Sequence, residues 1–158
     1  MLIELVGAER VDDLRELWLE LHHHHRALAA VPLVADDALS WQRRRALYLE
    51  RLSTDRAFLV CAVDGEAVVG YALVCLEDGP DDTFTVGERY AELYSLCVAE
   101  AARGRGLGTR VLDAVDAELA ARGIEDLRVA VMIGNEGAKR LYERRGLVGA
   151  ELVMYCLP

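Results

Sequence analysis

The 158-residue chain lacks the features that would place it in a membrane or on a secretory route. No run of apolar residues approaches the ~20 that a helix needs to cross a bilayer. The first residues, MLIELVGAERVDD, carry acidic side chains early and contain no basic segment followed by an apolar one, as a signal peptide would. We therefore expect a cytoplasmic protein with no membrane partner.

Basic residues are too few for a typical nucleic-acid-binding protein. Eighteen Lys and Arg stand against 27 Asp and Glu, which gives a formal net charge of −9. A field of this sign repels phosphate backbones and mildly favours cationic partners. The sequence therefore argues against nucleic acid as a partner.

The chain also lacks paired cysteines and a recognisable metal motif. No two cysteines are spaced as C-x-x-C, and Cys61, Cys75, Cys97 and Cys156 each lie among apolar neighbours. This pattern predicts buried, reduced thiols. Four consecutive histidines occupy positions 22–25. Because neighbours on a helix diverge by about 100°, four in a row cannot bind one metal ion together, and we expect no metal site.

What is present suits one folded domain over residues 1–158, because 53% of the residues are hydrophobic and 28% are charged. Hydrophobic periodicity predicts the order β α α β β β α β α β, a mixed α/β (α+β) fold with helices on both faces of the sheet. Ser40 is the expected N-cap of the second helix. The expected strands are 2–6, 57–63, 66–76, 90–98, 125–132 and 147–157, and the expected helices are 11–29, 41–52, one from the glycine-rich loop to about 122, and 135–145.

A glycine-rich loop follows the strand 90–98 and leads into a helix. Such a loop aims unpaired N–H groups outward, and glycine lets an anion approach the backbone closely, so the loop predicts a phosphate or pyrophosphate site. The alternative is a tight strand-to-helix connection without a ligand. The loop residues are Arg103, Gly104, Arg105, Gly106, Leu107, Gly108 and Thr109.

Two common phosphate-binding motifs do not fit this loop. No Gly-Lys-Ser/Thr follows, so the P-loop of nucleoside triphosphatases is absent. The dinucleotide fingerprint G-x-G-x-x-G, counted from Gly104, places Thr109 where its last glycine should be. The acids Glu125 and Asp126 lie at the start of the next strand, whereas the ribose would need one at its end.

The loop resembles the acetyl-coenzyme A site of the GNAT superfamily of N-acetyltransferases. The family pattern Gln/Arg-x-x-Gly-x-Gly/Ala matches Arg103, Gly106 and Gly108. The resemblance covers residues 90–147, while residues 1–89 agree only in the order of elements. A second family pattern, Asn-x-x-Ala-x-x-x-Tyr followed by Gly and a large apolar residue, matches Asn135, Ala138, Tyr142, Gly146 and Leu147.

The resemblance implies acetyl-coenzyme A as the cofactor and assigns it contacts. The amides of residues 103–109 would hold the pyrophosphate, and the backbone of Leu96, Cys97 and Val98 would pair with the pantetheine arm as a strand does. Asn135 would bond a pantetheine amide, and Tyr142 would reach the sulfur.

Acetyl transfer to an amine also needs a base, an acid and a stabilised carbonyl oxygen. An alkylammonium has a pKa near 10.4, so a proton must leave before attack. Glu92 is the expected base, on the same alternation face as Tyr94 and Leu96, and a water relay is the alternative. Tyr142 is the expected general acid toward the thiolate, and the N–H of Val98 is an expected donor to the carbonyl oxygen.

The acceptor side is less defined by the sequence. By the resemblance the first two helices flank the acceptor, which makes His22, His25 and Trp41 candidate acceptor contacts beside Glu92. The run Arg43 to Arg45 is interpreted as a solvated helix face. Acids between positions 77 and 92 are suited to attract a cationic amine or simply to solubilise a loop.

The sequence thus predicts acetyl transfer to a primary amine of a small metabolite, an antibiotic-like polyamine, or a peptide or protein. Two alternatives stay open, a non-catalytic acyl-coenzyme A sensor and a nucleotide-dependent oxidoreductase. Only twelve residues follow Gly146, so the chain end is expected to form one long strand or a cramped pair. A long end strand would leave an edge for a second copy, which makes a homodimer plausible.

Overall fold

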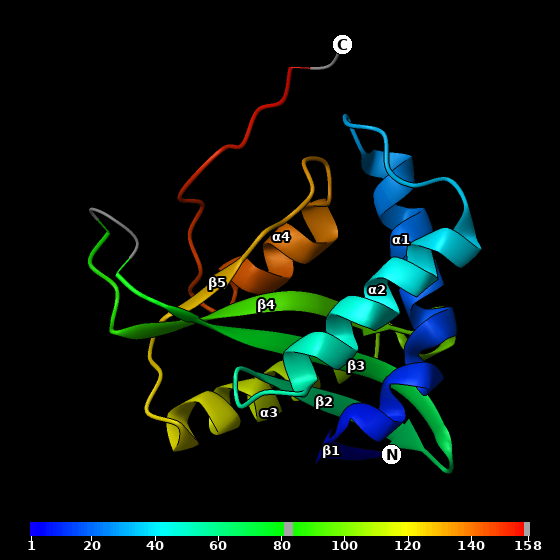
Figure 1. Ribbon diagram of the computed structural model, residues 1–158, viewed down its shortest axis with the longest axis horizontal. Coiled ribbons are helices and arrows are strands. Elements are labelled where there is room, and N and C mark those ends of the chain that lie inside the picture. Colours follow the sequence, from blue (N-terminus) through cyan, green and yellow to red (C-terminus); the bar gives the residue numbers. More distant parts are fainter. Residues whose placement is uncertain (81–83, 157–158) are drawn as a thin grey trace.

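The computed structural model describes residues 1–80 and 84–156. Its centre is a five-stranded sheet with the strands in chain order, β1 (Leu2–Val6), β2 (Ala57–Asp64), β3 (Ala67–Asp78), β4 (Arg89–Val98) and β5 (Leu127–Val129). The first four strands pair antiparallel, and β5 joins β4 in parallel, as Figure 1 shows. The predicted mixed sheet is confirmed.

Helices cover both faces of this sheet (Figure 1). One face carries the 3₁₀ helix η1 (Ala8–Leu14), α1 (Arg15–Leu28) and α2 (Asp37–Leu52). The other carries α3 (Leu107–Ala121) and α4 (Glu136–Glu143), and a short 3₁₀ turn, η2 (Glu100–Ala102), lies between β4 and α3. The order of helices and strands up to α4 is the predicted one.

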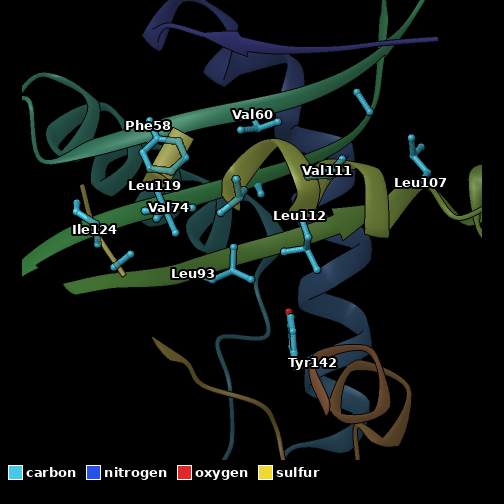
Figure 2. Close-up of a cluster of buried hydrophobic side chains, with 14 of the residues drawn as sticks. Phe58, Val60, Val74, Leu93, Leu107, Val111, Leu112, Leu119, Ile124 and Tyr142 are labelled. Carbon is cyan, nitrogen blue, oxygen red and sulfur yellow. The ribbon is translucent and has the colours of Figure 1, made fainter. Parts of the chain in front are cut away.

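The sheet separates two apolar clusters because alternate residues of a strand point to opposite faces. In β3, Leu73 belongs to the cluster under α1 and α2, whereas its neighbour Val74 belongs to the cluster under α3 and α4. Figure 2 shows the α3 side, where Leu112 and Val111 of α3 pack over the sheet. Both faces are therefore buried, as the continuous apolar runs of β2 and β3 predict.

Helix starts differ in detail from the prediction. The segment from Val11 to Leu14 is 3₁₀ and precedes α1, where a continuous α-helix was expected. The N-cap of α2 is Asp36, whose carboxylate accepts a 2.7 Å hydrogen bond from the N–H of Leu39, so the prediction of Ser40 as N-cap was wrong. Ser40 instead accepts a 3.3 Å bond from the indole of Trp18. A carboxylate also favours a helix start electrostatically.

The chain end is the main departure. β5 has only three residues, and over the described residues 147–156 no strand is present, so the predicted final strand is wrong there; Leu157 lies outside the described residues. A strand forms only when a neighbour satisfies its backbone, and β5 pairs with β4 over three residues alone. Val148 and Met154 are 84% and 83% exposed. Cys156 is exposed too, whereas a buried thiol was predicted.

Over the described parts of the chain, no helix combines the length and apolar character needed to cross a bilayer. Within the same residues, no group of three or more His, Cys, Asp or Glu side chains is placed to hold a metal ion.

Candidate active site

The candidate site includes a β-bulge in β4. Leu73 of β3 pairs with Ser95, and the next residue, Val74, pairs with Leu93. Tyr94 of β4 therefore has no partner in β3 and is the extra residue of the bulge. A bulge of this kind changes which face later side chains point to. Before it Leu93 joins the α3 cluster; after it Leu96 packs against that same cluster, although the two are three residues apart.

The bulge corrects the expected position of Glu92. Its neighbours Ala91 and Leu93 both belong to the α3 cluster, so the Glu92 side chain points to the opposite face. Leu96 packs against the α3 cluster, so Glu92 and Leu96 do not share a face, contrary to the prediction. Glu92 faces Arg128 of β5, with 3.7 Å between Oε2 and Nη2.

Immediately after this pair, β4 and β5 separate. Their pairing covers Ala91, Glu92 and Leu93 only, while β4 continues to Val98 and β5 ends at Val129. A cavity of about 100 Å³ lies at this divergence. Its lining combines one wall from β4, one from 129–132, and side chains of α1, α2 and α4; the residues are Trp18, Leu21, His25, Arg44, Leu93, Tyr94, Ser95, Leu96, Val129, Ala130, Val131, Met132, Asn135, Ala138 and Tyr142.

The glycine-rich loop has the backbone shape of an anion site. Gly104 and Gly106 have φ of +73° and +72°, and Gly106 is the N-cap of α3 without a side-chain cap. A Cβ at either glycine would meet nothing within 4 Å, so backbone conformation and not space requires glycine there. In the described chain, no N–H of residues 104–109 donates to a protein acceptor. These amides, together with the helix start, suit a pyrophosphate.

Arg103 fixes the loop to β4 and α1 from the protein surface. Its Nε donates a 2.9 Å hydrogen bond to the carbonyl of Val98, and its Nη2 lies 3.3 Å from Oε2 of Glu20 in α1. Glu20 also accepts a 3.2 Å bond from the N–H of Glu100. Leu107 anchors the other end of the loop in the core, at 2% exposure. Arg105 and Thr109 are exposed at the loop surface.

Asn135 and Tyr142 are placed by α4. Asn135 caps the helix, because its side-chain oxygen accepts a 3.2 Å hydrogen bond from the N–H of Ala138. Two turns later Tyr142 projects toward Leu93 and Leu112 (Figure 2) and is 8% exposed. Burial raises the pKa of the Tyr142 hydroxyl to about 12, so the hydroxyl keeps its proton at neutral pH.

The Cys97 side chain is not among those that line the cavity. Its thiol donates a 3.2 Å hydrogen bond to the carbonyl of Leu17 in α1. Burial raises the pKa of this thiol to about 12, with Glu20 adding to the shift. Cys97 therefore has no nucleophilic thiolate, and only its backbone is available to a ligand beside β4.

The α1 and α2 side of the cavity carries two ionisable groups. Burial lowers the pKa of His25 to about 4, with smaller contributions from His24, Arg44 and His22, so the imidazole is neutral at physiological pH. The guanidinium of Arg44 lies 4.0 Å from the ring centroid of Trp18 and 5.1 Å from that of Tyr94. The cavity wall therefore holds one neutral base and one cation.

Comparison with known proteins decides the family. Residues 11–147 match the family described as the acetyltransferase (GNAT) family. The chain belongs to the GNAT acetyltransferases. This family consists of acetyl-coenzyme A-dependent N-acetyltransferases, and the resemblance of residues 90–147 is confirmed.

Individual relatives of this acetyltransferase are distant. It is 25% identical over 122 residues to an L-2,4-diaminobutyric acid acetyltransferase of Shouchella clausii, a match that covers 72% of this chain and 65% of that relative. A tetramutant of the BH1408 protein from Bacillus halodurans has the same fold, with a TM-score of 0.78, 22% identity and coverage of 100% and 99%. A Clostridium acetobutylicum protein, described as a predicted acetyltransferase with acetyl-CoA, has the same fold with a TM-score of 0.75 and 13% identity. That match covers 99% of this chain and 95% of the other.

Five of the residues predicted for the site line the cavity of the acetyltransferase. Leu96, Asn135, Ala138, Tyr142 and His25 line it together. The loop residues, from Arg103 to Thr109, follow the end of the same strand. Glu92 is not among the lining residues.

Two of the predicted acceptor contacts lie elsewhere. His22 is 5% exposed, donates a 2.6 Å hydrogen bond from Nε2 to the carbonyl of Val34 and stacks on Trp18, so it fixes the connection after α1. Trp41 is 8% exposed in the cluster between α2 and the sheet. Neither lines the cavity.

Sequence reasoning missed Arg44, Trp18 and Tyr94 in the acetyltransferase. The run of three arginines was interpreted as a solvated face, but Arg44 is half-buried, and its guanidinium lies beside rings from α1, α2 and β4. The one local signal is the i,i+4 spacing of Arg44 and Tyr48, which puts the two on one helix face.

A second hollow lies at the other end of the sheet. It measures about 560 Å³ and is bordered by β1, η1 and the end of α3, with Glu4, Arg10, Phe58 and Arg122 in its lining. It contains neither the glycine-rich loop nor any residue of α4. Although larger and lined by the carboxylates of Glu4, Glu9 and Glu118, it has, among the described residues, no tyrosine in its lining and no anion-binding loop beside it.

Proposed function

We propose that this acetyltransferase moves the acetyl group of acetyl-coenzyme A directly to a primary amine, with residues 1–158 acting as one N-acetyltransferase domain. The observation that carries the proposal is the position of Tyr142, on the wall of the cavity where β4 and β5 separate. A hydroxyl at that point can meet a thioester placed between the strands. Asn135 and Ala138 on the same helix support the same site.

The residues fit coenzyme A in three places. The free amides of residues 104–109 suit the pyrophosphate, and the loop is held in shape by Arg103. The β4 edge at Leu96, Cys97 and Val98 has no β5 partner, so its backbone is available to an extended amide-bearing arm. The Asn135 side chain, with its oxygen occupied by the cap, offers its NH₂ to a carbonyl of that arm.

The cofactor, when bound, supplies an activated acetyl thioester. The chain's task is then to deprotonate the amine, polarise the carbonyl and protonate the departing sulfur. The N–H of Val98 is the proposed donor to the carbonyl oxygen, in the manner of an oxyanion hole. Tyr142 is the proposed proton donor to the thiolate, because its hydroxyl lines the cavity and is protonated at neutral pH.

The ammonium proton is proposed to leave through water or through Glu92. Two observations support water as the first acceptor. Glu92 is not among the cavity-lining residues, and its carboxylate is held 3.7 Å from Arg128. The neutral imidazole of His25 lines the cavity, but a pKa of about 4 makes it a weak base for an amine.

The alternative of a non-catalytic acyl-coenzyme A sensor is separated by a release assay. Purified protein is given acetyl-coenzyme A and a panel of primary amines, and free thiol is measured. We expect release with at least one amine class and none without an amine. A sensor would show thermal stabilisation by acetyl-coenzyme A but no release with any amine. Stabilisation by NAD and not by acetyl-coenzyme A would favour the oxidoreductase instead.

A homodimer in the cytoplasm is also proposed. The apolar side chains of Val148, Leu152, Val153, Met154 and Tyr155 are between 66% and 84% exposed, and an extended segment of this composition pairs readily with a second copy. Light scattering of the purified protein tests this. A monomer at micromolar concentration would reject it.

A further inference from the structure

Arg44 is held in the cavity wall in an unusual way for a surface helix residue. Its guanidinium carbon lies 4.0 Å from the Trp18 ring centroid, 5.1 Å from that of Tyr94 and 5.6 Å from that of Tyr48. Rings from α1, β4 and α2 therefore surround the guanidinium. The Tyr48 hydroxyl is one hydrogen-bond partner of Arg44, and because a guanidinium has five N–H donors, others remain for an acceptor in the cavity.

No acidic side chain neutralises Arg44 in the described chain. Its neighbour Arg45 is paired with Asp12, with 2.9 Å between Nη2 and Oδ2, whereas none of the ion pairs among residues 1–80 and 84–156 includes Arg44. The described cavity lining contains neither Asp nor Glu. The protein as a whole carries a net charge of −9, so a cation without an acidic partner at this place is against the overall trend.

A cation in this position selects among amine acceptors by charge. A polycation would bring more positive charge beside Arg44 and find no acid in the described lining to offset it. His25 is neutral and adds no competing charge. An acceptor with an anionic group would pair with Arg44, and a carboxylate matches the planar fork of a guanidinium through two parallel N–H···O bonds.

We propose that the acceptor is a primary amine that also carries a carboxylate, with Arg44 as its carboxylate-binding residue. This inference rests on the proposed function and names its substrate class. Arg44 belongs to α2 and Tyr142 to α4, and both line the one cavity. A short amino acid would bridge them, with its carboxylate at α2 and its amine at the opening between β4 and β5.

The test uses acceptors that differ only in charge. Each amino acid bearing a terminal amine is compared with its carboxamide and with the diamine lacking the carboxyl group, and kcat/KM is measured by thiol release at saturating acetyl-coenzyme A. We expect the carboxylate to be preferred by about 10- to 100-fold, the size expected of hydrogen bonds to a charged group. An aminoalkyl phosphate is included, and its preference over every carboxylate would overturn the assignment of a carboxylate.

Variants assign the preference to Arg44. Arg44→Gln should remove most of the discrimination by raising KM for carboxylates, while KM for the carboxamides and the affinity for acetyl-coenzyme A stay close to wild type. Arg43→Gln is the matched control, because Arg43 is the exposed neighbour on α2. Arg44→Lys retains the charge but not the fork and should be intermediate.

The outcomes separate this inference from the proposed function. Absence of thiol release with every amine would reject the function itself. If kcat/KM is as high with carboxamides and diamines as with carboxylates, the proposed function stands and the role of Arg44 is overturned. If Arg44→Gln does not fold, the wild-type ratio between carboxylate and carboxamide still decides.

Discussion

Glu92 of β4 and Arg128 of β5 face each other across the parallel strand pair, with 3.7 Å between Oε2 and Nη2. They stand just before the point where the two strands separate. Arg128 also lies 6.0 Å above the Tyr90 ring centroid, which keeps its guanidinium over β4. The pair therefore lies in the last hydrogen-bonded part of the β4–β5 ladder, next to the cavity.

The first prediction follows from this pair. Glu92→Gln should lower kcat/KM by less than about tenfold, since general-base catalysis by a residue at the reacting atom typically contributes 10²–10⁴ and Glu92 is absent from the cavity lining. Arg128→Gln is the matched control, because it breaks the pair but keeps the carboxylate. A decrease of 10² or more in the Glu92 variant alone would show that this carboxylate takes the amine's proton.

Tyr142→Phe tests the proposed acid. We expect turnover to fall by about 10- to 10³-fold while the dissociation constant of acetyl-coenzyme A changes little, because the ring stays and only the proton donor is lost. Turnover is measured by thiol release and binding by calorimetry. Tyr155→Phe, at a 70% exposed position, should behave as wild type. Unchanged turnover in Tyr142→Phe would reject the assignment.

Gly106→Ala tests the loop. At φ +72° an alanine is strained, so we expect a loss of about 1–2 kcal/mol in unfolding free energy and weaker binding of acetyl-coenzyme A. For a chain of this size that loss lowers Tm by about 2–8 °C.

Gly108→Ala is the control for this loop prediction. Its Cβ would lie 3.9 Å from Leu141 and from Val98, which is ordinary contact, and it lies within α3. We expect its stability to equal or slightly exceed that of the wild type, because alanine favours a helix over glycine. Equal binding of acetyl-coenzyme A by the two variants would contradict the role of the Gly106 turn.

His25 predicts how stability depends on pH. Its folded-state pKa is about 4, below the value of about 6.5 in the unfolded chain, so the unfolded state binds the proton first as the pH falls. His25 therefore costs stability progressively between about pH 6.5 and pH 4. In urea titrations over this range, His25→Gln should lose less unfolding free energy than the wild type.

The exposed neighbour supplies the control for His25. His24→Gln should retain most of the wild-type slope, because His24 is exposed and lies outside the cavity lining. Parallel curves for wild type and His25→Gln would show that the imidazole is not desolvated.

Local motifs explain what the sequence predicted well. Gly106 and Asn135 lie where a loop meets a helix, as the sequence predicts; Gly106 is a left-handed N-cap and Asn135 caps α4, and such geometry depends on residues close by in the sequence. Tyr142 follows Asn135 by two helical turns, so its placement comes with the cap.

Tertiary relationships explain what the sequence missed. The bulge at Tyr94 arises from pairing with β3. The alternation of apolar and polar residues in β4 gives no sign of an extra residue. Arg44 looks like a surface charge until Trp18 and Tyr94, from two other elements, are packed against it. The final strand was wrong because strand propensity does not supply a hydrogen-bonding neighbour.

The extra residue at Tyr94 has a consequence for how such an enzyme changes over time. α1 and α2 line the cavity from one side of the sheet, and α4 lines it from the other side, where the glycine-rich loop leads into α3. Under the proposed function, substitutions in α1 and α2 would alter the choice of amine and leave Tyr142 and the glycine-rich loop in place.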